Sequence, residues 1–236
     1  MPKTKIRERR KHERPRRIRK TKAERIKRQQ NEPTKQQPKT IDNQRLPDPT
    51  YLEDNDQDVL DDINTDQLAA FFRLEKQAKV VLTTSPKAHT KTIKFCRQFK
   101  RCPPDAIYLT RHSYSIKSMI KAAADRGFTH LFIVQEHARR PYGLYLISLP
   151  DGPTAYFRCS SVSFCEQLRN PAGFSKHKPE IILNNFRTRL GLSIQRLLST
   201  PFHFDPDFKG RRVITFHNQR DYIFFRHHRL VDRFKV

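Results

Sequence analysis

The chain has 236 residues, of which 48 are Lys or Arg and 24 are Asp or Glu, so its formal net charge is +24. Such an excess favours a polyanionic partner, with nucleic acid first and an anionic membrane surface second. No apolar run approaches the roughly 18–20 residues that span a bilayer, and the basic N-terminus lacks the apolar segment of a secretory signal. Residues 1–30 also offer too few apolar side chains for a helix that binds a membrane surface. We therefore expect a protein that neither spans nor binds a membrane, and its four cysteines, as reduced thiols, fit an intracellular location.

The first 45 residues are predicted to form a basic, disordered tail and linker. Residues 1–30 hold 15 Lys and Arg against three acids and few apolar side chains. Such a segment cannot bury enough surface to offset its ordering entropy. Its basic clusters suit nuclear import or RNA contact, and a solubilising tail is the alternative. Residues 29–40, rich in Gln, Pro and Lys, are interpreted as the linker.

Residues 46–66 reverse the sign of the charge, with eight acids and no Lys or Arg. Three interpretations remain open for this acidic segment. It is an internal cover for a basic surface, a docking strip for a basic partner protein, or a solvated spacer. The folded region is expected to begin here, with Asp66 capping a helix over Gln67–Ala78. The apolar face of that helix would consist of Leu68, Phe71, Phe72 and Leu74.

From Lys79 the pattern alternates between strands and helices. Ser115 is expected to cap one helix and Gly127 to end it. The turn-forming run Pro150–Pro153 predicts a hairpin between the last two strands. The expected strands are 79–84, 106–110, 130–135, 144–149 and 154–158, and the expected helices are 90–100 and 116–126. This order predicts a mixed α/β sheet with helices packed on it.

A polar, turn-rich stretch at residues 169–178 is the expected boundary between two halves. A strand over Glu180–Leu183 and a helix over Phe186–Ser199 follow it. In that helix the apolar residues Leu190, Ile194, Leu197 and Leu198 are predicted to face inward, and Arg187, Arg189 and Arg196 outward. Residues 201–210 are then expected to form a loop.

The segment Arg211–Arg229 (RRVITFHNQRDYIFFRHHR) concentrates five Arg, three His and four aromatic residues against one acid. Val213–Phe216 and Tyr222–Phe225 are predicted strands, joined by a loop over His217–Asp221. Alternation along a strand would anchor Ile214 and Phe216 in the core and turn His217 to the other face. Cations give phosphate affinity and rings stack on unpaired bases, so RNA binding is one interpretation. A core hairpin with solvated charges is the other.

Signals for catalysis, metal binding or a cofactor are absent from the sequence. The six glycines are dispersed, no Gly-x-Ser-x-Gly elbow occurs, and the acids of the folded part are scattered. Cys96, Cys102, Cys159 and Cys165 lack the spacing of a zinc knuckle and are expected to be buried, reduced thiols. We therefore expect no enzymatic activity, no small-molecule substrate, no cofactor and no metal site.

Several longer motifs resemble the Brix-domain family of ribosome-assembly factors. They are LPDGPTAYF (149–157), PEIILNNFRTRLG (179–191) and FKGRRVITFHNQRDYIFFRHHR (208–229). The resemblance extends from about Gln44, through VVLTTS (80–85), to the end of the chain. ILNNF and NQRDYIFFR are more similar to the members that act on large-subunit precursors. The alternative is the related type of the small-subunit processome.

The resemblance implies an α/β fold of two similar halves, each like the anticodon-binding domain of some tRNA synthetases. It also implies a non-catalytic nucleolar protein whose partners are the pre-rRNA of the large subunit and other assembly factors in the precursor particle. The basic hairpin is the implied RNA-contacting segment, with Arg220 at the loop tip and Arg226 at the strand end as the strongest candidates. The residues carried over by this match are Arg211, Arg212, His217, Asn218, Gln219, Arg220, Arg226, His228 and Arg229. Arg187 and Arg189 complete the expected RNA-binding set.

The Brix domain is thus expected over residues 67–236, with a first half at about 79–168 and a second at about 179–236. Family members continue past the basic hairpin with further strands and a helix, whereas this sequence stops at Val236. The second half is therefore incomplete, completed by a partner, or shortened. An alternative function is a protein-interaction scaffold in the precursor particle, in which only the tail contacts RNA.

Overall fold

The computed structural model describes residues 20–22, 24–25, 38–41, 43–44, 46, 49–52, 57–169, 171, 173–175, 177–202, 211–220 and 222–229. The chain divides into two compact units, residues 1–48 and 49–236. In the first, residues 20–22 and 24–25 are helical, and the Asn43 amide donates to Thr40 Oγ1 at 3.2 Å. The rest of the expected tail lies outside the described residues.

The first half of the second unit is built on a five-stranded sheet. Its elements are β1 (Val80–Thr84), α4 (Thr90–Phe99), β2 (Ile107–Tyr108), α5 (Ile116–Asp125), β3 (His130–His137), β4 (Arg140–Ser148) and β5 (Thr154–Arg158). The strand order is β2-β1-β3-β4-β5. β1 pairs in parallel with β2 and β3, whereas β4 is antiparallel to both β3 and β5. The expected mixed sheet is confirmed.

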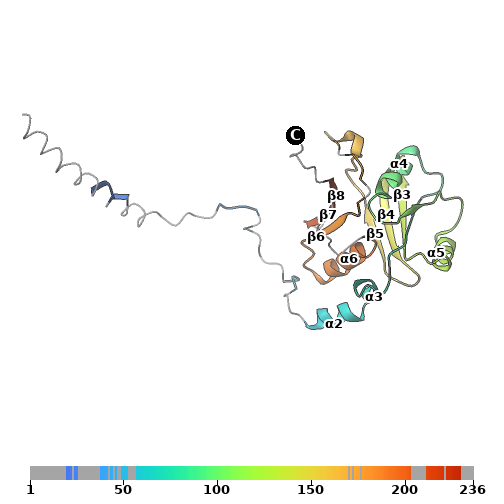
Figure 1. Ribbon diagram of the computed structural model, residues 1–236, viewed down its shortest axis with the longest axis horizontal. Helices are drawn as coiled ribbons and strands as arrows, with labels where there is room; N and C mark the ends of the chain where they lie inside the picture. The colour runs from blue at the N-terminus through green and yellow to red at the C-terminus, as the bar shows by residue number, and fades with distance from the viewer. Residues whose placement is uncertain are drawn as a thin grey trace, which may run out of the picture. The chain divides into compact units, whose positions relative to one another are not determined.

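Helices cover both faces of this sheet, because alternate residues of the buried strands are apolar on each face. One face packs against α4 through Val80, Leu82, Phe132 and Leu146. The opposite face packs against α5 through Val81, Leu131, Ile133 and Ile147. Figure 1 shows α5 on the side of the sheet that lies away from α6.

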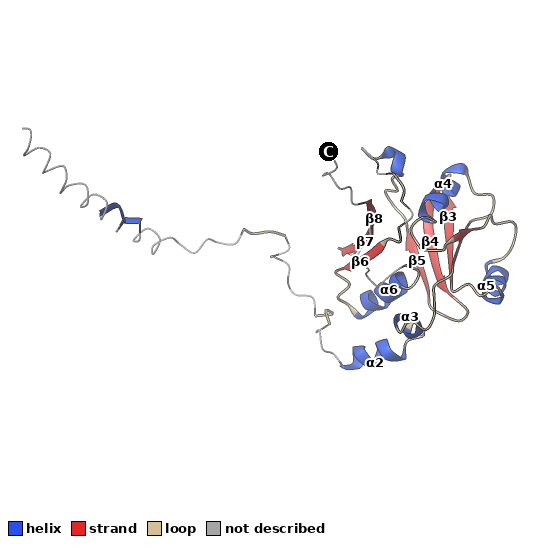
Figure 2. Ribbon diagram, viewed as in Figure 1, coloured by secondary structure: helices blue, strands red, loops and turns tan. Residues whose placement is uncertain are grey.

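The second half is a smaller three-stranded sheet with one helix. A 3₁₀ helix at Cys165–Gln167 precedes it, and its elements are β6 (Glu180–Asn184), α6 (Arg189–Ser199), β7 (Arg212–Gln219) and β8 (Tyr222–Arg229). β6 and β7 are parallel, and β7 and β8 form an antiparallel hairpin (Figure 2). Ile214 and Phe216 of β7 and Leu197 of α6 join the cluster on the α4 side of the larger sheet. The two halves therefore share one core.

The two halves follow the same path, as expected. β1, α4, β3 and β4 of the first half correspond in order and pairing to β6, α6, β7 and β8 of the second. Among the described residues, β2, α5 and β5 of the first half have no counterpart in the second. No described helix therefore covers the outer face of the smaller sheet as α5 covers that of the larger one.

The helices predicted at 90–100 and 116–126 are confirmed as α4 and α5. Ser115 Oγ accepts a hydrogen bond from the Ser118 amide at 3.2 Å, the expected N-cap. Gly127 has φ of +73°, the left-handed conformation that glycine adopts without a steric cost.

The helix predicted over Gln67–Ala78 is wrong in length, since only Ala69–Phe72 forms α3. Leu74 has φ of +60° and is exposed, so the chain leaves the helix there instead of continuing its apolar face. Asp66 Oδ1 does accept from the Leu68 amide, at 3.3 Å. The acidic segment contains an unpredicted helix, α2 (Gln57–Thr65). Asp48, Glu53, Asp54 and Asp56 lie outside the described residues.

The predicted helix Phe186–Ser199 begins three residues late, as α6. Thr188 is extended, with φ of −93° and ψ of 160°, so the helix cannot begin before Arg189. Thr188 Oγ1 accepts from the Gly191 amide at 3.0 Å as the N-cap. Leu190 is exposed instead of buried. Arg196, expected to face outward, is half-buried because its guanidinium pairs with Asp66.

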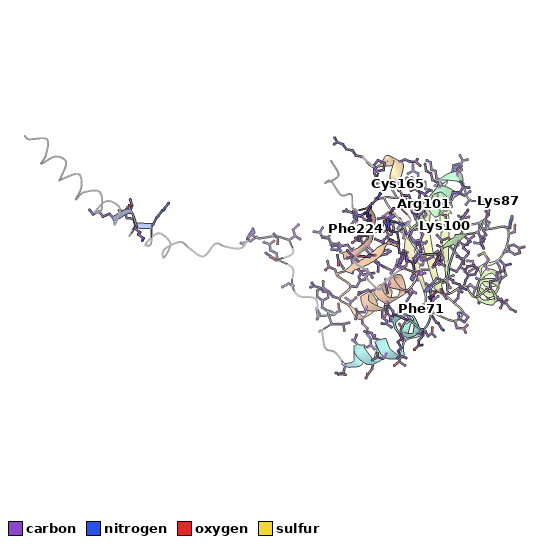
Figure 3. All side chains as sticks on the ribbon, in the orientation of Figure 1. Phe71, Lys87, Lys100, Arg101, Cys165 and Phe224 are labelled. Atoms are coloured by element: carbon purple, nitrogen blue, oxygen red, sulfur yellow. The ribbon has the colours of Figure 1, made fainter. Side chains whose placement is uncertain are left out.

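The four cysteines are all free, and two of them are buried. Burial raises the pKa of Cys96 and of Cys102 to about 12, so both are protonated thiols. Cys159 is partly buried, whereas Cys165 is exposed, contrary to expectation, because its 3₁₀ helix lies on the surface (Figure 3). No cluster of three metal-ligating side chains occurs among the described residues, and no described helix is both long and apolar enough to cross a bilayer.

Candidate nucleic-acid interface

The basic hairpin β7–β8 has an inner and an outer face that carry different chemistry. The inner face is anchored by Ile214 and Phe216, which are buried in the shared core. The ring of Phe225 lies 5.2 Å from that of Phe216 and 5.8 Å from that of Phe99 on α4. The strands are longer than predicted, since His217–Gln219 continues β7 and β8 runs to Arg229. Arg226 therefore lies in mid-strand and not at a strand end.

The outer face brings cations, amides and rings together across the two strands. Register pairs Thr215 with Arg226 and His217 with Phe224, so their side chains share this face. A shallow groove of about 320 Å³ is lined by Thr215, His217, Gln219, Phe224, Arg226 and His228. His217, Gln219, Arg226 and His228, four of the predicted RNA-binding residues, thus lie around one depression. We refer to this set of six residues as the outer groove.

Aromatic side chains border the outer groove and remain exposed. Tyr222 is 67% exposed and Phe224 46% exposed, and both lie on β8, an edge strand of the smaller sheet. Phe224 lies on the side of the smaller sheet that faces away from the core (Figure 3). Ile182 of the adjacent strand β6 is also exposed. Rings held flat on a sheet and flanked by cations form a surface on which unpaired bases can stack.

Arg212 points the opposite way and is only 4% exposed. Its guanidinium donates to the carbonyls of Ser175 (3.2 Å), His177 (2.9 Å) and Arg101, and lies 4.7 Å from the Phe174 ring. Its Nε donates to His227 Nε2 at 3.1 Å. Arg212 therefore joins the two halves instead of facing a ligand, and it leaves the candidate RNA-binding set.

Three further residues of the hairpin are turned toward the protein. Arg229 Nη1 donates to the Gly173 carbonyl at 2.6 Å, and Asn218 Nδ2 donates to the Asn185 carbonyl at 3.2 Å. Partial burial lowers the pKa of His227 to about 4, with smaller contributions from the Arg212 guanidinium and His228. As expected, His227 and His228 lie on opposite faces, because His228 lines the outer groove.

The remaining predicted cations lie at the ends of the hairpin and beside α6. Arg220 is exposed at the turn with φ of +54°, and Arg211 is exposed just before β7. Arg187 lies over the Tyr51 ring at 6.0 Å. Arg189 forms an ion pair with Asp62 of α2. Together with the Asp66–Arg196 pair, this places two acids of the acidic segment against arginines of α6.

Sequence reasoning did not include the rings Tyr222 and Phe224, or Thr215, among the candidate site residues. Alternation along a strand puts Tyr222, Phe224, Arg226 and His228 on one face, and this signal was sufficient to find them. The same alternation puts Arg212, the first residue of β7, on the buried face with Ile214 and Phe216, so it could also have separated Arg212 from its exposed neighbour Arg211.

The two halves, the shared core and the basic hairpin define a known class of protein. The Brix domain family model matches residues 83–234. The chain belongs to the Brix-domain family.

Similar proteins occur in distant animals and in fungi. The chain is 46% identical over 197 residues to the "Brix domain-containing protein F44G4.1" of Caenorhabditis elegans, covering 84% of this chain and 51% of that protein. It is 44% identical over 200 residues to "Ribosome production factor 1" of Rattus norvegicus, covering 84% and 58% respectively. The chain thus spans just over half the length of these relatives.

A more distant relative and a solved structure are also similar. The "Brix domain-containing protein C4F8.04" of Schizosaccharomyces pombe is 35% identical over 201 residues, covering 84% of this chain and 66% of that protein. A crystal structure of a "probable ribosomal biogenesis protein" from Aeropyrum pernix K1 is 15% identical, with a TM-score of 0.47, covering 65% of this chain and 91% of that one.

Proposed function

We propose that this protein is a non-catalytic assembly factor that binds the pre-rRNA of the large ribosomal subunit precursor in the nucleolus. Family membership and the similarity to proteins named ribosome production factor 1 support a role in ribosome biogenesis. The nucleolus and the large subunit rest on the motif resemblance described above. Its partners would be pre-rRNA and other assembly factors of the precursor particle.

The observation that carries RNA binding is the contrast between equivalent faces of the two sheets. The face covered by α5 in the first half presents Val81, Leu131 and Ile133. The equivalent face of the second half presents Asn184, His217 and Arg226, together with exposed rings. An apolar helix packed on this face would bury the cations without partners, which costs much free energy. A polyanion with stackable bases satisfies both the cations and the rings.

The electrostatic setting supports the same assignment. Among the described residues of the outer face, Glu180 is the only one with a carboxylate. It lies at the start of β6, away from the hairpin tip. Arg211 and Arg220 extend the positive charge to both ends of the hairpin. The mechanism is electrostatic capture of a phosphate backbone, followed by stacking of unpaired bases on Tyr222 and Phe224.

Titration of RNA by the full chain and by Arg226→Gln tests the proposal. Losing one phosphate contact should weaken binding roughly threefold to tenfold and reduce the salt slope by about 0.7–0.9. Lys76→Gln, which removes one exposed cation near the opposite end of the larger sheet, is the matched control. An Arg226→Gln protein with an unchanged salt slope would contradict the role of the outer groove.

Two further experiments separate the rival functions. Deleting residues 1–40 should leave most of the RNA affinity in place, whereas the scaffold alternative requires the affinity to vanish with the tail. In-cell crosslinking with sequencing of the attached RNA should return large-subunit precursor reads. Small-subunit precursor reads would instead assign the protein to the processome.

A further inference from the structure

The hairpin β3–β4 of the first half occupies the place that the basic hairpin β7–β8 occupies in the second. Its turn is closed by the pair His137 and Arg140, and both residues between them, Ala138 (φ +50°) and Arg139 (φ +60°), are left-handed. Two-residue turns of this kind favour Asn-Gly, because residues with a Cβ are strained there. Arg139 therefore occupies a position where glycine would be less strained. Strained positions of this kind often carry a functional side chain.

Further cations gather at this end of the larger sheet. Arg139, Arg140 and Arg158 are all exposed, and register places Arg158 of the edge strand β5 beside Gly143 of β4. The Arg158 guanidinium lies over the Tyr142 ring at 5.3 Å, and the centroid of the His137 ring lies 5.3 Å from that of the Tyr142 ring. The ion pairs formed among the described residues leave these three arginines without a carboxylate partner.

The nearest acid on the strand, Glu136, is engaged elsewhere. Glu136 Oε2 accepts from the His89 amide at 2.7 Å and from Thr92 Oγ1 at 2.5 Å, at the start of α4. It therefore holds the first turn of α4 against β3. The local field at the hairpin end is consequently positive.

An exposed ring continues this surface along β5. Tyr156 is 46% exposed, and its ring lies 4.7 Å from that of Tyr145, which packs against the α5 cluster. The Tyr156 ring extends over Gly143, where a Cβ would lie 2.6 Å from its hydroxyl oxygen. Glycine at that position allows the ring to lie flat on the sheet, with one face toward solvent.

We propose that this end of the first half is a second RNA-binding surface, which engages single-stranded RNA. It consists of Arg139, Arg140, Tyr142, Tyr156 and Arg158, and we refer to it as the β3–β4 patch. The arginines contact phosphates, and Tyr156 stacks on an unpaired base. The inference deepens the proposed function, since its ligand is also RNA, but it uses residues of the other half.

The test variant removes the Arg139 side chain and at the same time relieves the backbone strain of the turn. The double variant Ala138→Asn/Arg139→Gly installs the turn sequence that the geometry favours, so its urea midpoint should equal or exceed that of the wild type. Its affinity for a fluorescein-labelled single-stranded RNA of about 20 nucleotides should fall roughly threefold to tenfold, and its salt slope should fall by about 0.7. Tyr156→Leu should also weaken binding but leave the salt slope unchanged, because stacking releases no counterion.

Two comparisons make the outcome decisive. Lys121→Ala on α5 removes one positive charge from an exposed position and should leave the RNA affinity and the salt slope unchanged. If this variant lost as much RNA affinity as the turn variant, the effect would come from net charge alone and the β3–β4 patch would be overturned. Arg226→Gln is measured with the same RNA. If it weakens binding while the turn variant and Arg158→Gln bind like the wild type, the β3–β4 patch is wrong and the outer groove stands. If none of them changes binding, both are overturned.

Discussion

His130 Nε2 lies 2.8 Å from Thr200 Oγ1, which joins the central strand of the first half to the end of α6 in the second. Both side chains are buried, and the other ring nitrogen of His130 lies 2.9 Å from Thr129 Oγ1. A histidine with both nitrogens engaged and no contact with water fixes how the two halves meet, because a shift of either half would leave a buried polar group unpaired.

Thr200→Val should therefore lower the unfolding free energy by about 1–3 kcal/mol, the cost of an unsatisfied buried polar group. Thr154→Val, at an exposed position of β5, is the control and should change stability by less than about 0.5 kcal/mol. Urea unfolding measures both. Equal stabilities for the two variants would show that the His130–Thr200 contact contributes nothing.

The stability of the protein should also depend on pH through His130. Burial lowers the pKa of His130 from 6.5 to about 4. Because the unfolded chain then binds the proton more tightly, the unfolding free energy falls as the pH drops from about 6.5 to about 4, by about 3 kcal/mol in total. Urea unfolding at several pH values should show this slope. His130→Gln should reduce this slope to the part that His227, whose pKa is also lowered to about 4, still contributes, and His112→Gln, at an exposed position, should not change it.

Arg212 is expected to act on stability and not on RNA binding. Arg212→Ala should destabilise the protein by about 3 kcal/mol or more, because it leaves several buried carbonyls without a donor. Arg212→Lys keeps the positive charge but loses the planar guanidinium with its several donors. It should therefore recover only part of the lost stability. The folded fraction of Arg212→Ala, which lacks the charge, should bind RNA with the wild-type salt slope. A reduced slope would return Arg212 to the RNA-binding set.

The acidic helix α2 is expected to compete with RNA for the arginines of α6. Asp62 and Arg189 are both more than half exposed, so Asp62→Asn should change stability by less than about 1 kcal/mol. It should nevertheless tighten RNA binding about twofold at low salt, because it removes a negative charge beside Arg189. Asp66→Asn should cost more stability, since Arg196 is half-buried against the Phe72 ring at 4.3 Å. Unchanged RNA affinity in Asp62→Asn would favour the solvated-spacer interpretation of this segment.

Most strands and helices could be predicted because their apolar residues alternate or recur at helical spacing. β1, α4, α5 and β3 are of this kind. The failures involve single backbone conformations that hydrophobic pattern does not encode. Leu74 adopts a positive φ value beyond the end of α3, and the extended Thr188 delays the start of α6.

The candidate site was predictable in part for a similar reason. Composition located the basic hairpin, and alternation placed His217 and Arg226 on the face opposite Ile214. The inward turn of Arg212 depends on carbonyls at residues 101, 175 and 177. Alternation along β7 puts Arg212 on the same face as Ile214, but no local pattern in the sequence indicates which distant carbonyls it binds.

Ultraviolet crosslinking of the full chain to RNA, followed by mass spectrometry of the peptide adducts, tests RNA binding by the outer groove most directly. Bases stacked on exposed rings should crosslink to Tyr222 and Phe224, and at RNA concentrations below saturation the adducts on this peptide should fall roughly threefold to tenfold in Arg226→Gln. Adducts confined to residues 1–40, with the peptide spanning Tyr222–Arg229 unmodified, would contradict the account.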